Sequence, residues 1–153
     1  MQTPEFDVQT AHRYFAADCF NKTWGYLDKK DRTPSENLDM ISTCHASYWH
    51  WTQCADHTPL NISVAYWQLS RVYAMTNQPK LALSFASLCL KISQTNELSP
   101  FNMAYAYEAL ARASSVANKP EEAATWLENA KKIAESDLET DEKQQLLTDL
   151  NTI

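Results

Sequence analysis

Apolar residues recur along this chain at the three- and four-residue spacing of amphipathic helices, and no stretch alternates apolar and polar residues as a β-strand does. Six prolines separate the helical segments, and each can occupy the first position of a helix, where its missing N–H costs nothing. Four of them follow a residue whose side-chain oxygen can cap the helix: Thr3, Thr33, Thr58 and Ser99. The pattern predicts an all-α protein of seven helices in one domain over residues 1–153.

The helices are expected over residues 4–27, 34–55, 59–75, 79–95, 100–116, 120–135 and 140–150. The second should begin with a capping box, because Glu36 stands three residues after Thr33. The residues expected to face the core are Phe6, Ala11, Phe15, Cys19 and Trp24 in the first helix, and Leu38, Ile41, His45, Tyr48, Trp49 and Thr52 in the second. The last helix has one leucine face and acids elsewhere, which predicts a solvated capping helix.

Residues 59–91 form a helical hairpin that recurs 41 residues later. The shift aligns Pro59 with Pro100, Tyr66 with Tyr107, Leu69 with Leu110, Arg71 with Arg112, Asn77 with Asn118, Pro79 with Pro120, Ala82 with Ala123 and Phe85 with Trp126. A single helix pair cannot bury its apolar face alone, so the repeat predicts helix pairs stacked side by side.

The repeat resembles the tetratricopeptide family, whose pattern is W-x2-L-G-x2-Y followed by A-x3-F. The first unit has Tyr66-x2-Leu69-Ser70-x2-Tyr73 and then Ala82-x3-Ala86, and the second has Tyr107-x2-Leu110-Ala111-x2-Ser114 and then Ala123-x3-Leu127. The segments H-A-S-Y-W-H-W and W-Q-L-S-R-V-Y-A are also similar to a group of small bacterial helical-repeat proteins. The resemblance implies a short right-handed solenoid. The period of 41 residues rather than 34 predicts longer helices and a different groove.

In that family the first helix of each pair lines a concave groove. The resemblance places Trp67, Arg71, Tyr105, Glu108 and Arg112 there. Guanidinium groups beside aromatic rings suit a peptide that carries a carboxylate and apolar groups. This predicts an interaction or scaffold module for a peptide or partner helix. The competing interpretation is a surface Glu108–Arg112 pair worth a few tenths of a kcal/mol, with Arg71 lying over Trp67.

The alternative function is a small-molecule- or metal-binding protein with a pocket near His45, Trp49 and His50. The competing interpretation of these residues is a packed aromatic interface in which the histidine is hydrogen-bonded, and such residues form an interface of this kind more often than a pocket. Cys44, His45, Cys54 and His57 are metal-ligand types. However, Cys44 and His45 are adjacent and point about 100° apart on a helix. Zinc is therefore disfavoured, and we expect no cofactor.

Charge and composition disfavour or exclude several classes of partner and of functional site. The net charge of −6 lies entirely in residues 120–153, which hold nine acids and three lysines, and this disfavours nucleic acids and anionic membranes as partners. The single glycine excludes glycine-rich phosphate loops, and no catalytic motif is present, so an enzyme is not expected. No apolar run reaches about 20 residues, and the acidic N-terminus is unlike a signal peptide. The sequence thus predicts a cytoplasmic protein with free cysteines, and a homodimer is an alternative use of its apolar faces.

Overall fold

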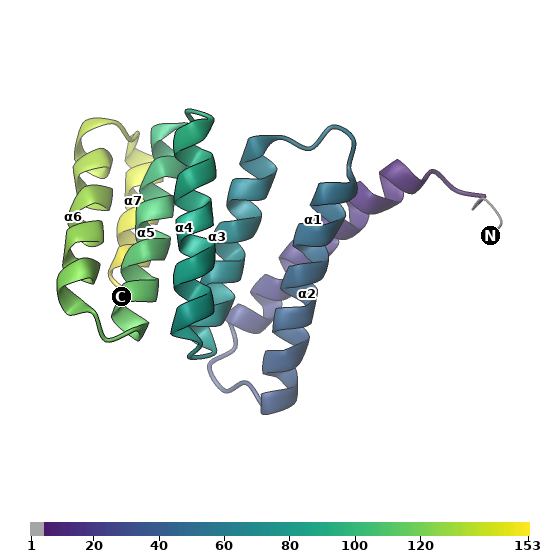
Figure 1. The fold of residues 1–153 in the computed structure, drawn as a ribbon, viewed down its shortest axis with the longest axis horizontal. Helices are drawn as coiled ribbons and strands as arrows, with labels where there is room; N and C mark the ends of the chain where they lie inside the picture. Colours follow the sequence, from purple (N-terminus) through teal and green to yellow (C-terminus); the bar gives the residue numbers. More distant parts are fainter. Residues whose placement is uncertain (1–4) are drawn as a thin grey trace.

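The computed structural model describes residues 5–153, and these form seven α-helices and no strand (Figure 1). The helices are α1 (Val8–Leu27), α2 (Pro34–Gln53), α3 (Pro59–Met75), α4 (Pro79–Thr95), α5 (Pro100–Val116), α6 (Pro120–Ser136) and α7 (Thr140–Leu150). The predicted all-α fold is confirmed, and α2 to α7 each begin at the predicted residue. The prolines and capping residues that set these starts act locally, which explains why the sequence is sufficient to place them.

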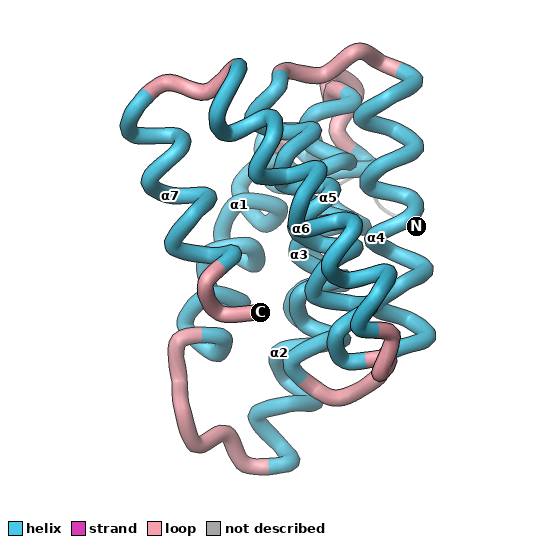
Figure 2. Tube along the Cα trace, turned by 90° about the vertical axis from the view of Figure 1, so that its left-hand side faces the viewer, coloured by secondary structure: helices cyan, strands magenta, loops and turns pink. Residues whose placement is uncertain are grey.

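Adjacent helices pack as pairs, α1 with α2, α3 with α4, and α5 with α6 (Figure 1). The pairs stack in chain order, because α2 packs against α3 and α4 packs against α5. The last helix, α7, has no partner of its own and packs against both α5 and α6 (Figure 2). Within the described chain, no helix is long and apolar enough to cross a membrane.

The 41-residue repeat extends to the backbone of the loops. Asn77 and Asn118 both adopt the left-handed conformation, with φ angles of 55° and 56°. The next residue closes the turn in each case, because Gln78 N–H donates to the Tyr73 carbonyl and Lys119 N–H donates to the Ser114 carbonyl. These are the asparagine-terminated helix ends that let the chain reverse without glycine. The two hairpins are therefore one conformational unit used twice.

The first helix differs from its prediction in both its start and its core face. Pro4 lies outside the described residues, and α1 begins at Val8 with the Asp7 carboxylate as its cap. Phe6 and Phe15, expected in the core, are 64% and 45% exposed. The buried positions of α1 are Ala16 and Thr23. Ala16 lies against α2, where its carbonyl accepts a hydrogen bond from Ser47 Oγ at 2.8 Å.

The core face of α2 matches the predicted one in part. Ile41 and Tyr48 pack against the core as expected, whereas Leu38 and Trp49 are 67% and 53% exposed. The fully buried residues of α2 are Met40, Cys44 and Ser47. The predicted capping box of Thr33 and Glu36 is present.

Candidate functional site on α3 and α5

The five residues expected in a groove do come together, and Glu108 is at their centre. Glu108 is completely buried in α5 and accepts hydrogen bonds from side chains of α3 and of α5 itself. Trp67 Nε1 donates to Oε2 at 2.8 Å, and Arg71 Nη1 donates to Oε1 at 3.2 Å. Arg112 Nε, one turn further along α5, donates to Oε1 at 2.8 Å. We call Trp67, Arg71, Tyr105, Glu108 and Arg112 the α3/α5 face.

The end of α7 covers this face with a second carboxylate. Asp149 accepts from Arg71 Nη2 at 3.3 Å and from the Tyr105 hydroxyl at 2.8 Å. Arg112 Nη2 donates to the Asp149 carbonyl at 3.1 Å and to Thr152 Oγ1 at 2.8 Å. Two carboxylates thus balance two guanidinium groups. This arrangement corrects the interpretation of Glu108 and Arg112 as a surface pair, because Arg112 is only 7% exposed.

Arg71 lies beside two tryptophan rings, Trp24 and Trp67, whose ring centres are 5.7 Å apart. Its guanidinium carbon is 5.9 Å from the ring centre of Trp67 and 5.9 Å from that of Trp24. The predicted placement over Trp67 is confirmed, whereas the contact with Trp24 of α1 was not anticipated from the sequence. The two rings hold the planar guanidinium in place by cation–π attraction and so connect α1 to the α3/α5 face.

Burial also alters the chemistry of Tyr105. Removal from water raises the pKa of its phenol, and the hydrogen bond to the Asp149 carboxylate raises it further. The hydroxyl therefore remains a hydrogen-bond donor at neutral pH. It fixes the position of Asp149 without adding negative charge.

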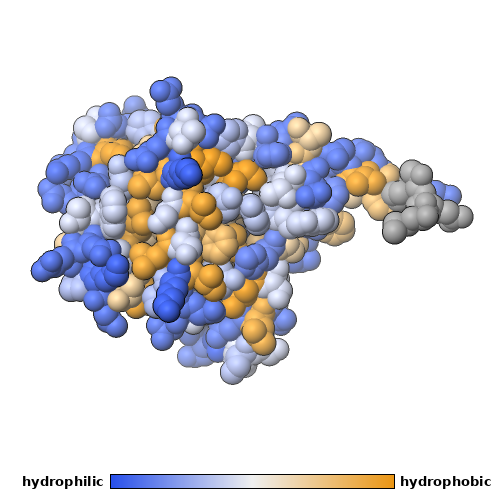
Figure 3. Space-filling view, viewed as in Figure 1, coloured by the Kyte–Doolittle hydropathy of each residue, from blue (hydrophilic) through white to orange (hydrophobic). Residues whose placement is uncertain are grey.

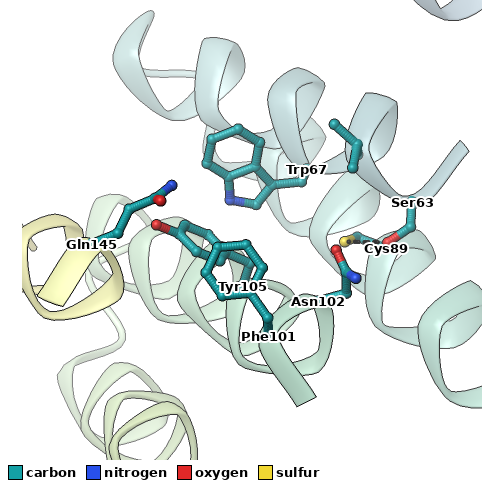
Figure 4. Close-up of a pocket in the computed structure, with 8 residues that line it drawn as sticks. Ser63, Trp67, Cys89, Phe101, Asn102, Tyr105 and Gln145 are labelled. Atoms are coloured by element: carbon teal, nitrogen blue, oxygen red, sulfur yellow. Dashed lines mark hydrogen bonds between the residues drawn. The ribbon is translucent and has the colours of Figure 1, made fainter. Parts of the chain in front are cut away.

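A cavity of about 130 Å³ lies beside α7 at one end of the α3/α5 face (Figure 4). Its lining residues are Ser63, Val64, Trp67, Cys89, Phe101, Asn102, Tyr105 and Gln145. Figure 4 shows Trp67 on one side, facing Phe101 and Tyr105 on the other, with the polar groups at the two ends. The ring centres of Trp67 and Tyr105 are 5.4 Å apart, and those of Phe101 and Tyr105 are 4.9 Å apart. The walls are therefore mainly aromatic.

Cys89 and Ser63 contribute a thiol and a hydroxyl to the wall of the cavity. Burial raises the pKa of the Cys89 thiol to about 11, so it stays protonated and unreactive at neutral pH. Ser63 Oγ is already hydrogen-bonded to Ser93 Oγ at 2.8 Å. The cavity can hold an apolar group, since a cavity of about 150 Å³ lined by apolar side chains can bind benzene.

The three residues of the alternative pocket do not line one site. His45 Nε2 is 2.7 Å from the Tyr73 hydroxyl, and its ring packs against Tyr73 and Phe85. His50 lies on another side of α2, where its Nδ1 is 2.8 Å from Nδ1 of His12. Trp49 contacts both His12 and His50. Among residues 5–153, no group of three or more potential metal ligands converges.

Acidification is expected to destabilise the protein through these histidines. Burial lowers the pKa of His45, and burial followed by the proximity of His12 lowers the pKa of His50. The folded state therefore binds fewer protons than the unfolded chain below a pH of about 6.5. The contribution of the two histidines to the free energy of unfolding is fully present above that pH. It is lost as the pH falls through their lowered pKa values.

Urea unfolding at about pH 7.5 and about pH 5.5 tests this dependence, with the lower midpoint expected at the lower pH. His50→Gln should make the difference between the two midpoints smaller. A variant whose midpoint falls as much as that of the wild-type protein would exclude His50 as a source of the effect.

No family model, curated protein or solved structure matches this chain.

Proposed function

We propose that this protein is an interaction module that binds a peptide or partner helix at the cavity beside α7, next to the buried α3/α5 face, with one apolar side chain of the partner inserted into the cavity. The observation that carries the proposal is the open cavity between Trp67, Phe101 and Tyr105. It adjoins a face on which one helix of the chain, α7, is already bound. The tetratricopeptide-like repeat pattern supports the same class of function.

The size and lining of the cavity define the partner group. About 130 Å³ accommodates one side chain of leucine to phenylalanine size. Aromatic walls favour an apolar group, and a well-packed central anchor contributes most of the binding energy in such interfaces. Asn102 and Gln145 stand at the two ends of the cavity and can bind the partner backbone (Figure 4).

The arginines have a different role from the one expected from the sequence. Arg71 and Arg112 are each paired with Glu108 and also bonded to the end of α7. We therefore assign them to holding α7 on the face. A carboxylate on the partner is not part of the proposal.

Selection of binders from a random peptide library, using the wild-type protein as bait, tests the proposal. Enriched peptides should share an apolar residue whose replacement by alanine weakens binding at least about tenfold, or about 1.4 kcal/mol. Val64→Phe fills the cavity and should weaken the same peptides by a similar factor. Leu88→Phe, at a 40% exposed position of α4 outside the cavity, is the matched control. Peptides that bind wild-type and Val64→Phe proteins equally would refute the cavity as the site.

A further inference from the structure

The first helix is far less covered than an equivalent helix inside the stack. Of the 20 residues of α1, Ala16 and Thr23 are buried. In α5, which has 17 residues, the buried positions run almost without interruption from Ala104 to Ser114. The N-terminal half of α1 projects beyond the other helices (Figure 1), and apolar residues reach the surface there (Figure 3).

Five aromatic and histidine rings form one surface at this end of the molecule. We call His12, Tyr14, Phe15, Trp49 and His50 the N-terminal face. Tyr14, Phe15 and Trp49 are 63%, 45% and 53% exposed. Adjacent ring centres lie 4.9 to 5.4 Å apart, and within the described chain the ring contacts of these residues are all with one another.

Such a surface is unusual for the end of a helical stack. Terminal units of stacked repeats normally present a polar outer face, since no further unit covers them. A contiguous exposed aromatic patch marks a surface that another molecule covers. Within residues 5–153, no further helix covers the N-terminal face.

The opposite end of the stack has its cap. There α7 buries Leu146 and Leu150 against α5 and α6. Residues 120–153 also carry nine acids against three lysines, so two copies repel each other at this end. Head-to-tail stacking would place an aromatic face on an acidic, already covered one.

The charges beside the N-terminal face suit contact with an identical face. Arg13 of α1 forms an ion pair with Asp56, and the two side chains are 55% and 66% exposed. The two groups neutralise each other, so two identical faces can meet without the like-charge repulsion expected at the acidic end.

We propose that two copies of this chain associate through their N-terminal faces to form a two-fold symmetric dimer. The aromatic rings of each copy cover those of the other, and the neutral Arg13–Asp56 pair of each copy lies beside them. The contact is closed, because each copy uses the same face and the far ends are capped. This dimer is independent of the proposed peptide site, which is lined by residues of α3, α4, α5 and α7 and shares none with the N-terminal face.

Sedimentation equilibrium of the full chain from about 1 µM to about 300 µM tests the dimer. The average mass should rise with concentration from 17.5 kDa towards twice that value. Phe15→Asp and Trp49→Asp, each at an exposed position, should raise the dimer dissociation constant at least about tenfold without changing the helical circular dichroism. Leu88→Asp, at a 40% exposed site on α4, should leave the constant unchanged.

Two results would overturn the proposal. A mass of 17.5 kDa at every concentration would leave the N-terminal face to a different protein. A dimer that tolerates both Phe15→Asp and Trp49→Asp would have its interface elsewhere. Charge reversal adds a positive criterion: Arg13→Asp should weaken the dimer, and combining it with Asp56→Arg should restore it.

Discussion

Replacement of Glu108 by glutamine is expected to lower the free energy of unfolding by about 3 to 5 kcal/mol. The substitution keeps the size of the side chain but removes the charge that Arg71 and Arg112 share. Arg71 then keeps the Asp149 carboxylate, whereas Arg112 is left with the Asp149 carbonyl and the Thr152 hydroxyl and has no carboxylate partner. An unpaired charge in a dry environment is among the most destabilising single changes in a folded protein.

Glu128 offers a matched control for this experiment. It also precedes a base by four residues, Lys132, but both side chains are 66% exposed. Glu128→Gln should therefore change stability by no more than about 0.5 kcal/mol. Urea unfolding of the two variants gives the comparison. If Glu108→Gln unfolded as the control does, the carboxylate would have no structural role at the centre of the α3/α5 face.

Replacement of Leu146 by alanine is expected to release α7 from the stack. Leu146 is completely buried among Tyr105, Ala130 and Ala134, and it is the largest fully buried side chain of α7. Loss of such a leucine typically costs about 2 to 5 kcal/mol. Because α7 is the terminal helix, it can open without the rest of the chain unfolding.

Hydrogen exchange distinguishes this local opening from general destabilisation. The amides of residues 140–150 should exchange much faster in Leu146→Ala, while those of α3 retain most of their protection. Leu81→Ala, at a 42% exposed position of α4, should leave both segments unchanged. Equal loss of protection in α3 and α7 would mean that α7 is an inseparable part of the core.

The stack could be predicted from the sequence because its determinants are local or periodic. Pro59 and Pro100 mark the same boundary in two units, and Asn77 and Asn118 end the same helix. The meeting of Trp67 with Glu108 follows from the same period, since the two residues are 41 positions apart. Periodicity alone therefore indicates which residues of the two units lie next to each other on the α3/α5 face.

The features that escaped prediction depend on contacts without a local pattern. Asp149 is one of many acids on a solvated helix, and only the fold brings it to Arg71, 78 positions earlier. His12 meets His50 in the same way, across two helices. The core faces of α1 and α2 were predicted only in part, because the small residues Ala16 and Ser47 meet where the two helices contact, whereas large apolar residues dominate the sequence pattern.

The hydrogen bond between Trp67 and Glu108 limits how this chain can be lengthened by duplication of a repeat unit. The two residues occupy the same position of the repeat, yet one is a donor and the other an acceptor. A further copy of residues 59–99 inserted after the first would place tryptophan next to tryptophan, with two arginines and no carboxylate between them. Simple duplication of that unit would thus create an unpaired buried charge. The two hairpins are therefore not interchangeable. A stack lengthened at this junction needs an acidic residue at the repeat position that Trp67 and Glu108 share.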